Sequence, residues 1–261
     1  MAEKTFWEHL EEMRWLLLRC IAVVFAIAVA AFCMKDFVFN NIILAPRETD
    51  FVTYRALCWL ARVTGISSLC PQIITGEMIN INLATQLFTH LSVSFYLAIV
   101  VALPYIITEV WLFVSPALYS KERRPAAWAV AAFFFQFFLG MALAYFLIFP
   151  LTYNFLSNYQ VSSSVVNQIS LNSYISTFIG LVFVMALVFE MPVVAYFFAK
   201  ISMLNSEWLS RYRKIAIVAT LILAAFITPS TDIFTMCLVA LPLYLLYEFS
   251  RYVVKRVERK K

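Results

Sequence analysis

The chain has 261 residues, of which 63% are hydrophobic and only 13% are charged, and its formal net charge is +5. A soluble domain carries about 25% charged residues, so this composition excludes a water-soluble globule and makes lipid the main solvent of the chain. No Pro/Gly-rich linker and no internal repeat divides the sequence. We therefore expect residues 1–261 to form a single transmembrane bundle domain of the all-α class.

The first apolar stretch is preceded by residues 1–14, which carry more acids than bases. This does not fit a basic, cleavable leader, so we expect a cytoplasmic N-terminal helix followed by a retained span at Trp15–Met34. Residues 35–86 then form a long extracytoplasmic loop. Helical apolar spacing from Phe51 to Val63, followed by Gly65, predicts a short helix on the outer surface.

Two of the five cysteines, Cys58 and Cys70, lie close together in this loop. They can form a disulfide if the loop is extracytoplasmic, and two free thiols are the alternative. Cys20, Cys33 and Cys237 lie in apolar stretches and are predicted to be small buried hydrophobic residues. The cysteines show no metal-ligand spacing.

Five further apolar stretches follow, at roughly Leu87–Phe113, Ala126–Tyr153, Leu171–Lys200, Ile215–Thr228 and Ile233–Phe249. A full crossing needs about 20 residues, so the last two spans are predicted to be short, and one re-entrant hairpin is an alternative for this pair. Pro104 and Pro192 should kink the second and fourth spans, because proline lacks the backbone donor. The sequence thus predicts a polytopic protein with six transmembrane helices in a curved, cupped bundle.

Lysine and arginine set the expected orientation. Of these 20 residues, 15 lie before span one, between spans two and three, between four and five, or after span six. The positive-inside rule therefore places both termini in the cytoplasm. The basic tail, residues 251–261, is most simply an anchor attracted to anionic lipid rather than a nucleic-acid site.

One acid, Glu190, interrupts the fourth span about 15 Å from its cytoplasmic end. An ionised carboxylate near the midplane is costly, so Glu190 is predicted to be protonated or to face a wetted cavity or a polar partner helix. The alternative is a single internal hydrogen bond that orders the bundle. We favour a functional role, since buried acids in spans usually have one.

Other polar residues in or beside the spans have simpler explanations. Asp232 follows a turn and is predicted to cap the sixth helix, and His90 is predicted to be a hydrogen-bonded helix residue. Glu109 and Glu248 lie near cytoplasmic ends, where they can reach water. No metal spacing, catalytic triad signature, P-loop or dinucleotide fingerprint is present. The sequence therefore predicts neither an enzyme nor a cofactor.

Four carboxylates gather on the side that carries the positive charge. Glu8, Glu11 and Glu12 share one helical face just before span one, and Glu122 lies in the short loop after span two. The macrodipole at a helix N-terminus explains such acids without a function. Carboxylates at a cytoplasmic face also suit guanidinium groups, which they bind bidentately.

These residues occur in a series of motifs that resembles the TatC family, the multispanning core of the twin-arginine protein translocase. The motifs are Phe6-Trp7-Glu8-His9-Leu10-Glu11-Glu12-Met13-Arg14, Leu103-Pro104, Trp111-Leu112-Phe113-Val114-Ser115-Pro116-Ala117-Leu118-Tyr119, Glu122-Arg123-Arg124, Gly140-Met141-Ala142-Leu143-Ala144-Tyr145-Phe146, Phe149-Pro150, Phe189-Glu190-Met191-Pro192, Thr228-Pro229 with Asp232, Ala240-Leu241-Pro242, and Tyr247-Glu248. Their order and spacing hold across almost the whole chain.

The resemblance implies a function at the cytoplasmic face of a bacterial inner membrane. Proteins of this family bind the paired arginines of export signal peptides, and Glu12 and Glu122 match the recognition positions, with Phe113, Pro116 and Leu118 in the same loop motif. The resemblance implies that Glu190 and Pro192 recruit single-span subunits of the TatA and TatB type, with Met236 at a neighbouring partner position. Pro46, Pro104, Tyr145, Asp232 and Glu248 match structural positions of the family.

The resemblance further implies an oligomeric complex that exports folded proteins with the proton-motive force. The sequence departs from the family pattern at Leu16, where a second basic residue is common, and at Met236, where glutamine is usual. The outer loop between Arg47 and Gly76 is also longer than is usual in the family. A proton-coupled small-molecule transporter that uses Glu190 is the alternative, and an intramembrane enzyme is a third hypothesis for which we find no catalytic residues.

Overall fold

Helices make up nearly all of the backbone in the computed structural model, which describes residues 6–66, 70, 78–117, 120–162, 167–228 and 232–259. The side chains of Phe6, Glu8, His9, Ala117 and residues 120–126 lie outside the description. Extended pairing in the described ranges is limited to an isolated bridge between Ile79 and Ser170, which confirms the all-α class. The chain packs as two units, Met1–Asn41 with Asn82–Phe134 and Ile42–Ile81 with Phe135–Lys261, so a single domain stays a prediction.

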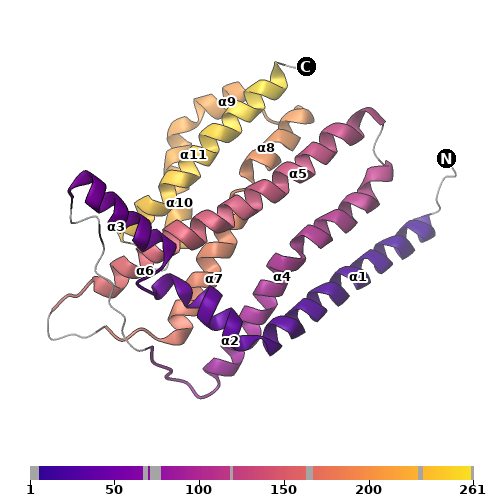
Figure 1. Cartoon of the computed structure of the whole chain (residues 1–261). Helices are drawn as coiled ribbons and strands as arrows, with labels where there is room; N and C mark the ends of the chain where they lie inside the picture. Colours follow the sequence, from indigo (N-terminus) through magenta and orange to yellow (C-terminus); the bar gives the residue numbers. More distant parts are fainter. Residues whose placement is uncertain are drawn as a thin grey trace. The chain divides into compact units, whose positions relative to one another are not determined.

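In the first unit, α1 (Phe6–Cys33) packs along α4 (Thr85–Val114), as Figure 1 shows. The predicted N-terminal helix and the first span are thus one continuous helix. Helix α4 continues through Pro104, whose carbonyl accepts a hydrogen bond of 2.7 Å from the Thr108 hydroxyl. It is followed by the 3₁₀ turn η4 (Ser115–Ala117) and by the start of α5 (Ser120–Leu143).

The prediction of a hydrogen-bonded His90 is wrong for its Nε2 atom, which is buried and has no hydrogen-bond partner in the described part of the chain. The imidazole instead stacks on Phe32 with ring centroids 4.0 Å apart, and it meets Phe39 edge-on. Packing between aromatic rings therefore fixes this side chain.

In the second unit, the third predicted span continues from α5 through the π-helical turn η5 (Ala144–Ile148) into α6 (Phe149–Asn158). The fourth span is broken into α7 (Leu171–Val188) and α8 (Met191–Lys200), because Pro192 cannot donate to the carbonyl four residues back. A short helix α9 (Ser206–Arg211) leads to α10 (Arg213–Ile227) and α11 (Ile233–Glu258). Helix α11 packs along both α8 and α10.

Five helical segments in the described ranges are long and apolar enough to cross a membrane: Leu10–Cys33, Thr85–Val114, Ala127–Asn158, Leu171–Lys200 and Ile233–Glu258. The predicted fifth span corresponds to α10, which is indeed short at 15 residues. The prediction of a short sixth span is wrong for the helix, since α11 runs for 26 residues, or about 39 Å. Asp232 caps its N-terminus as predicted, because its Oδ1 accepts a 2.8 Å bond from the Thr235 amide.

The segment after span one is fastened to spans three and four by tyrosines. It contains the π-helical turn η1 (Val38–Ile43), the 3₁₀ turn η2 (Ala45–Arg47) with Pro46 buried, and α3 (Val52–Thr64). The Tyr145 hydroxyl donates to the Ile42 carbonyl at 2.8 Å, and the Tyr174 hydroxyl donates to the Ile43 carbonyl at 2.7 Å. These bonds satisfy carbonyls at the end of the π turn, where the regular helical ladder stops.

The predicted outer helix corresponds to α3, and Gly65 ends it in the left-handed conformation with φ of +73°. A disulfide joins Cys58 on this helix to Cys70. Among the remaining cysteines, only Cys20 is buried within the protein. The prediction that Cys33 and Cys237 are buried within the protein is wrong, because both are exposed on the surfaces of their helices.

Candidate functional site

A cavity of about 590 Å³ lies in the first unit between α1 and α4. Helix α1 contributes one face of its N-terminal half, because residues three and four apart project from the same side of a helix. The end of α4 and the turn η4 form the opposite wall, again with residues three or four apart. The lining residues are Glu11, Glu12, Trp15, Leu16, Arg19, Glu109, Leu112, Phe113 and Pro116.

Three carboxylates therefore converge on one cavity. Glu11 and Glu12 are exposed at its rim, whereas the Glu109 side chain is only 16% exposed. Glu109 accepts a 2.8 Å hydrogen bond from the Tyr105 hydroxyl, and its Oε2 lies 3.6 Å from Nη1 of Arg19. The cavity is thus lined by three acids and by one arginine of the same chain, and its remaining lining residues are aromatic or apolar.

Glu109 is a member of this cavity that the sequence alone did not single out. Its position four residues before Phe113 is the signal that places both on one face of α4. Arg19 reaches the same cavity from α1 and pairs with Glu109.

The cavity brings together three of the residues that the family resemblance singles out, namely Glu12, Phe113 and Pro116. Leu118 lies outside the described residues, and so does the side chain of Glu122. The backbone of Glu122 belongs to the first turn of α5, which begins at Ser120, only three residues after η4.

Glu190 lies in the second unit, at the turn between α7 and α8. Its side chain is 5% exposed, and neither carboxylate oxygen has a hydrogen-bond partner in the described part of the chain. The alternative of a single internal hydrogen bond is therefore not observed among the described residues. Pro192 is buried in the first turn of α8, and Met236 is half-buried on α11.

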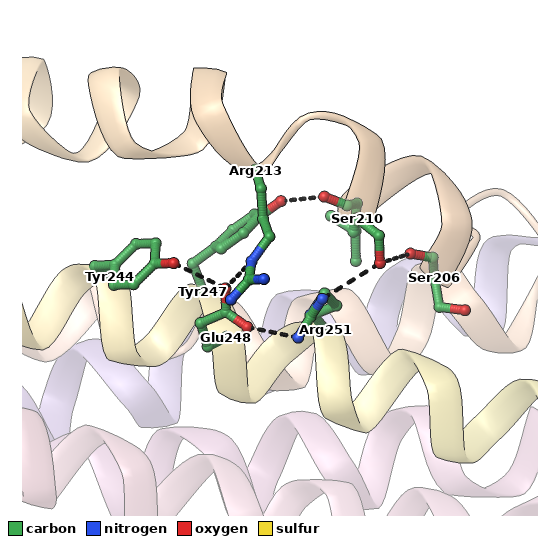
Figure 2. A network of polar contacts seen from close by, with 8 residues as sticks. Ser206, Ser210, Arg213, Tyr244, Tyr247, Glu248 and Arg251 are labelled. Atoms are coloured by element: carbon green, nitrogen blue, oxygen red, sulfur yellow. Dashed lines mark hydrogen bonds and ion pairs between the residues drawn. The ribbon is translucent and has the colours of Figure 1, made fainter.

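A polar network joins α9 and the start of α10 to α11, as Figure 2 shows. The Glu248 carboxylate accepts 2.6 Å and 3.0 Å hydrogen bonds from Arg213 Nε and the Tyr244 hydroxyl, and its other oxygen lies 2.8 Å from Arg251. Arg251 also donates to the Ser210 hydroxyl at 3.4 Å. Two arginines thus neutralise an acid inside α11, which explains why the helix continues past Glu248.

Metal binding is not indicated in the described residues, where no group of three His, Cys, Asp or Glu side chains could hold an ion. The acids of the cavity share it with an arginine and apolar walls instead. Such a site suits a cationic, planar group such as guanidinium, which binds carboxylates bidentately and stacks on aromatic rings.

Comparison with known proteins gives the same result by sequence and by structure. Residues 8–242 match the family model of the Sec-independent protein translocase protein TatC. A protein of that name from Blattabacterium sp. subsp. Periplaneta americana is 32% identical over 99% of this chain and 98% of its own length. Another from Aquifex aeolicus is 31% identical over 97% of this chain and 96% of its own.

Two crystal structures of a twin arginine translocase receptor, TatC, are similar to this chain. One aligns with a TM-score of 0.68 at 29% identity and covers 96% of this chain and 100% of that chain. The second, in DDM, aligns with a TM-score of 0.70 at 30% identity and covers 94% and 98%.

Proposed function

The chain belongs to the TatC family of Sec-independent protein translocase proteins, and from this premise we propose that it binds the paired arginines of export signal peptides in the cavity between α1 and α4. It is a multi-pass membrane component of a protein translocase. The observation that carries the proposal is the convergence of Glu11, Glu12 and Glu109 on one cavity. Acids in that arrangement attract a cation, and the side chains of the cavity walls determine how the cation is oriented.

The cavity walls supply the second part of recognition. Trp15 and Phe113 line the same cavity as the carboxylates, and a guanidinium plane stacks on aromatic rings while its donors reach carboxylate oxygens. Lysine has neither the plane nor the fork of donors. The proposed site therefore prefers an Arg-Arg signal over a Lys-Lys signal.

Glu122 is proposed as the partner of Glu12 in this recognition. Its backbone lies in the first turn of α5, close along the chain to Phe113 and Pro116. With Glu12 on α1 and Glu122 on α5, each of the two signal arginines has a carboxylate from a different helix. Each exposed pair contributes about 0.2–1 kcal/mol, so the apolar part of the signal must supply much of the affinity.

Glu190 is proposed as the contact for single-span subunits of the TatA and TatB type. A buried carboxylate with unsatisfied oxygens gains hydrogen bonds when a polar group of a partner helix reaches it. The proposal includes export driven by the proton-motive force, an oligomeric complex, and a bacterial inner membrane with both termini in the cytoplasm. The positive-inside distribution of lysine and arginine supports this orientation.

The test replaces Glu12 and Glu122 with glutamine, singly and together, and measures export of a folded reporter with an Arg-Arg signal. Each single variant should weaken binding of the signal peptide by about 1.4- to 5-fold, the factor that 0.2–1 kcal/mol represents. Glu207→Gln is the matched control, because Glu207 is an exposed acid of α9 that lies outside the cavity. Unchanged export in the double variant would overturn the assignment.

The comparisons do not favour the alternative of a proton-coupled small-molecule transporter. Both the family match and the two structural relatives are translocase components. Glu190 is also not among the residues that line the cavity of the first unit.

A further inference from the structure

Helix α3 has two faces of opposite character. Thr53, Tyr54 and Ala61 are buried on one of them. On the opposite face Val52, Trp59 and Val63 are 61%, 63% and 65% exposed. Large apolar side chains aligned along one exposed helix face indicate a surface that contacts something other than water.

Charge flanks this apolar stripe on one side. Arg55 and Arg62 are exposed and lie seven residues apart, so they follow the edge of the stripe at successive double turns. Residues 52–64 contain no aspartate or glutamate. An apolar stripe with a basic edge is the pattern of a helix that lies in a membrane interface, with its arginine stems along the acyl chains and its guanidinium groups at the phosphates.

The attachment of α3 to span three sets its depth. The Tyr54 hydroxyl donates to the Pro150 carbonyl at 2.9 Å, and the Phe51 ring stacks on Phe146 with centroids 5.8 Å apart. Span three runs from Ala127 to Asn158, which is about 48 Å and exceeds the hydrocarbon core by about 9 Å at each end. Pro150 lies about 12 Å before Asn158, hence close to the boundary between acyl chains and headgroups.

The direction of the exposed face follows from the same contacts. Because the buried face of α3 packs on span three, the opposite face points away from that span. Figure 1 shows α3 running sideways from α6 rather than along it. We therefore expect this face to meet lipid at this depth.

We propose that α3 binds the anionic phospholipid surface of the leaflet that the charge distribution predicts to be extracytoplasmic. Val52, Trp59 and Val63 enter the boundary of the acyl chains, and Arg55 and Arg62 bind the headgroup phosphates. The extracytoplasmic loop therefore contributes a membrane anchor in addition to the spans.

The test places a fluorescent label at adjacent positions in the full chain, with Cys20, Cys33 and Cys237 replaced by alanine and the Cys58–Cys70 disulfide retained. The variant Val63→Cys puts the label on the stripe, and Thr64→Cys, one residue further round the helix, is the matched control. The protein is reconstituted in nanodiscs of phosphatidylglycerol and phosphatidylcholine. Nitroxide-labelled lipid should quench the label at position 63 about twofold or more relative to position 64.

A second measurement separates lipid charge from hydrophobicity. In phosphatidylcholine alone, and in the variant Arg55→Gln/Arg62→Gln, the preferential quenching at position 63 should fall. Equal quenching at the two positions by a water-soluble quencher would overturn the proposal. Crosslinking from position 63 to a second copy of the chain would also overturn it, because the stripe would then be an interface between protomers.

Discussion

The Nη1 atom of Arg19 lies 3.6 Å from Oε2 of Glu109, within the acidic cavity of the first unit. Glu109 is the least exposed acid of that cavity, whereas the Arg19 side chain is 61% exposed. The chain thus places an arginine of its own on the carboxylate that an incoming guanidinium would find deepest in the cavity. An arginine ligand must either displace Arg19 or bind the outer acids, Glu11 and Glu12.

Replacement of Arg19 by glutamine should strengthen binding of an Arg-Arg signal peptide. The variant removes both a competitor for Glu109 and one positive charge, and we expect a gain of up to about 5-fold at low salt. Stability should change little, since the Arg19 side chain is largely exposed and the pair is long at 3.6 Å. Fluorescence anisotropy of a labelled peptide measures the affinity. Lys35→Gln is the control, because it removes the same charge from the short helix α2 (Lys35–Phe37), outside the cavity. Weaker binding by Arg19→Gln would show that Arg19 instead organises the site.

Replacement of Glu190 by leucine should stabilise the protein and abolish export. The carboxylate is buried without an internal hydrogen-bond partner in the described part of the chain, and exchanging an unsatisfied polar group for an apolar one relieves about 1–3 kcal/mol. Thermal unfolding in detergent and export of a folded reporter are the two measurements. Thr152→Val is the control, since the Thr152 hydroxyl is also buried and has no partner among the described residues. This variant should stabilise the protein without loss of export. A destabilised Glu190→Leu variant would contradict the prediction.

Much of the fold could be predicted because a helix that crosses lipid needs a run of about 20 mostly apolar residues. Apolar runs located the helices that cross the membrane, and Pro192 located the break in span four. The length of α11 could not be predicted, because Glu248 reads as a boundary until Arg213, 35 positions away, is seen to pair with it. Pairing between distant residues is a property of the packed bundle and leaves no local pattern.

In the candidate site, too, residues in local motifs could be predicted, and residues whose role depends on packing could not. Glu12, Phe113 and Pro116 belong to recognisable motifs, and the structure places all three on one cavity. Glu109 was not identified as part of a site, because its role depends on how α1 and α4 pack and on the pairing with Arg19 across the two helices. The exposed stripe of α3 was also missed, since the apolar spacing predicts a helix but does not say which apolar face the protein covers.

Removal of the Glu248 carboxylate should loosen the junction between α9 and α10. Glu248→Ala leaves Arg213 and Arg251 facing each other without the acid that joins them, and we expect a loss of about 1–2 kcal/mol, because the side chains are partly exposed. Hydrogen exchange at the start of α10 reports the local effect. The double variant with Arg213→Ala should lose less than the sum of the two single changes. Arg211→Ala, an exposed arginine of α9, is the control, and additive losses at positions 213 and 248 would contradict the network.

Addition of a single methyl group at Gly140 should disrupt the packing of span three against span four. A Cβ atom at this position would lie 2.6 Å from Cβ and Cγ of Phe189 and 3.0 Å from the Met185 carbonyl oxygen. Phe189 precedes Glu190 at the break between α7 and α8, so the ring cannot move away without shifting that turn. We expect Gly140→Ala to cost about 1–3 kcal/mol of stability.

The matched control for this change is Gly180→Ala in α7, where an added Cβ meets no atom within 4 Å. Alanine has a higher helix propensity than glycine, so this variant should be neutral or more stable by up to about 1 kcal/mol. Thermal unfolding of both variants in the same detergent gives the comparison. Equal stabilities would show that span three does not approach Phe189 as closely as the structure places it. A selective loss in Gly140→Ala, accompanied by reduced export, would show that this helix contact holds the turn that presents Glu190.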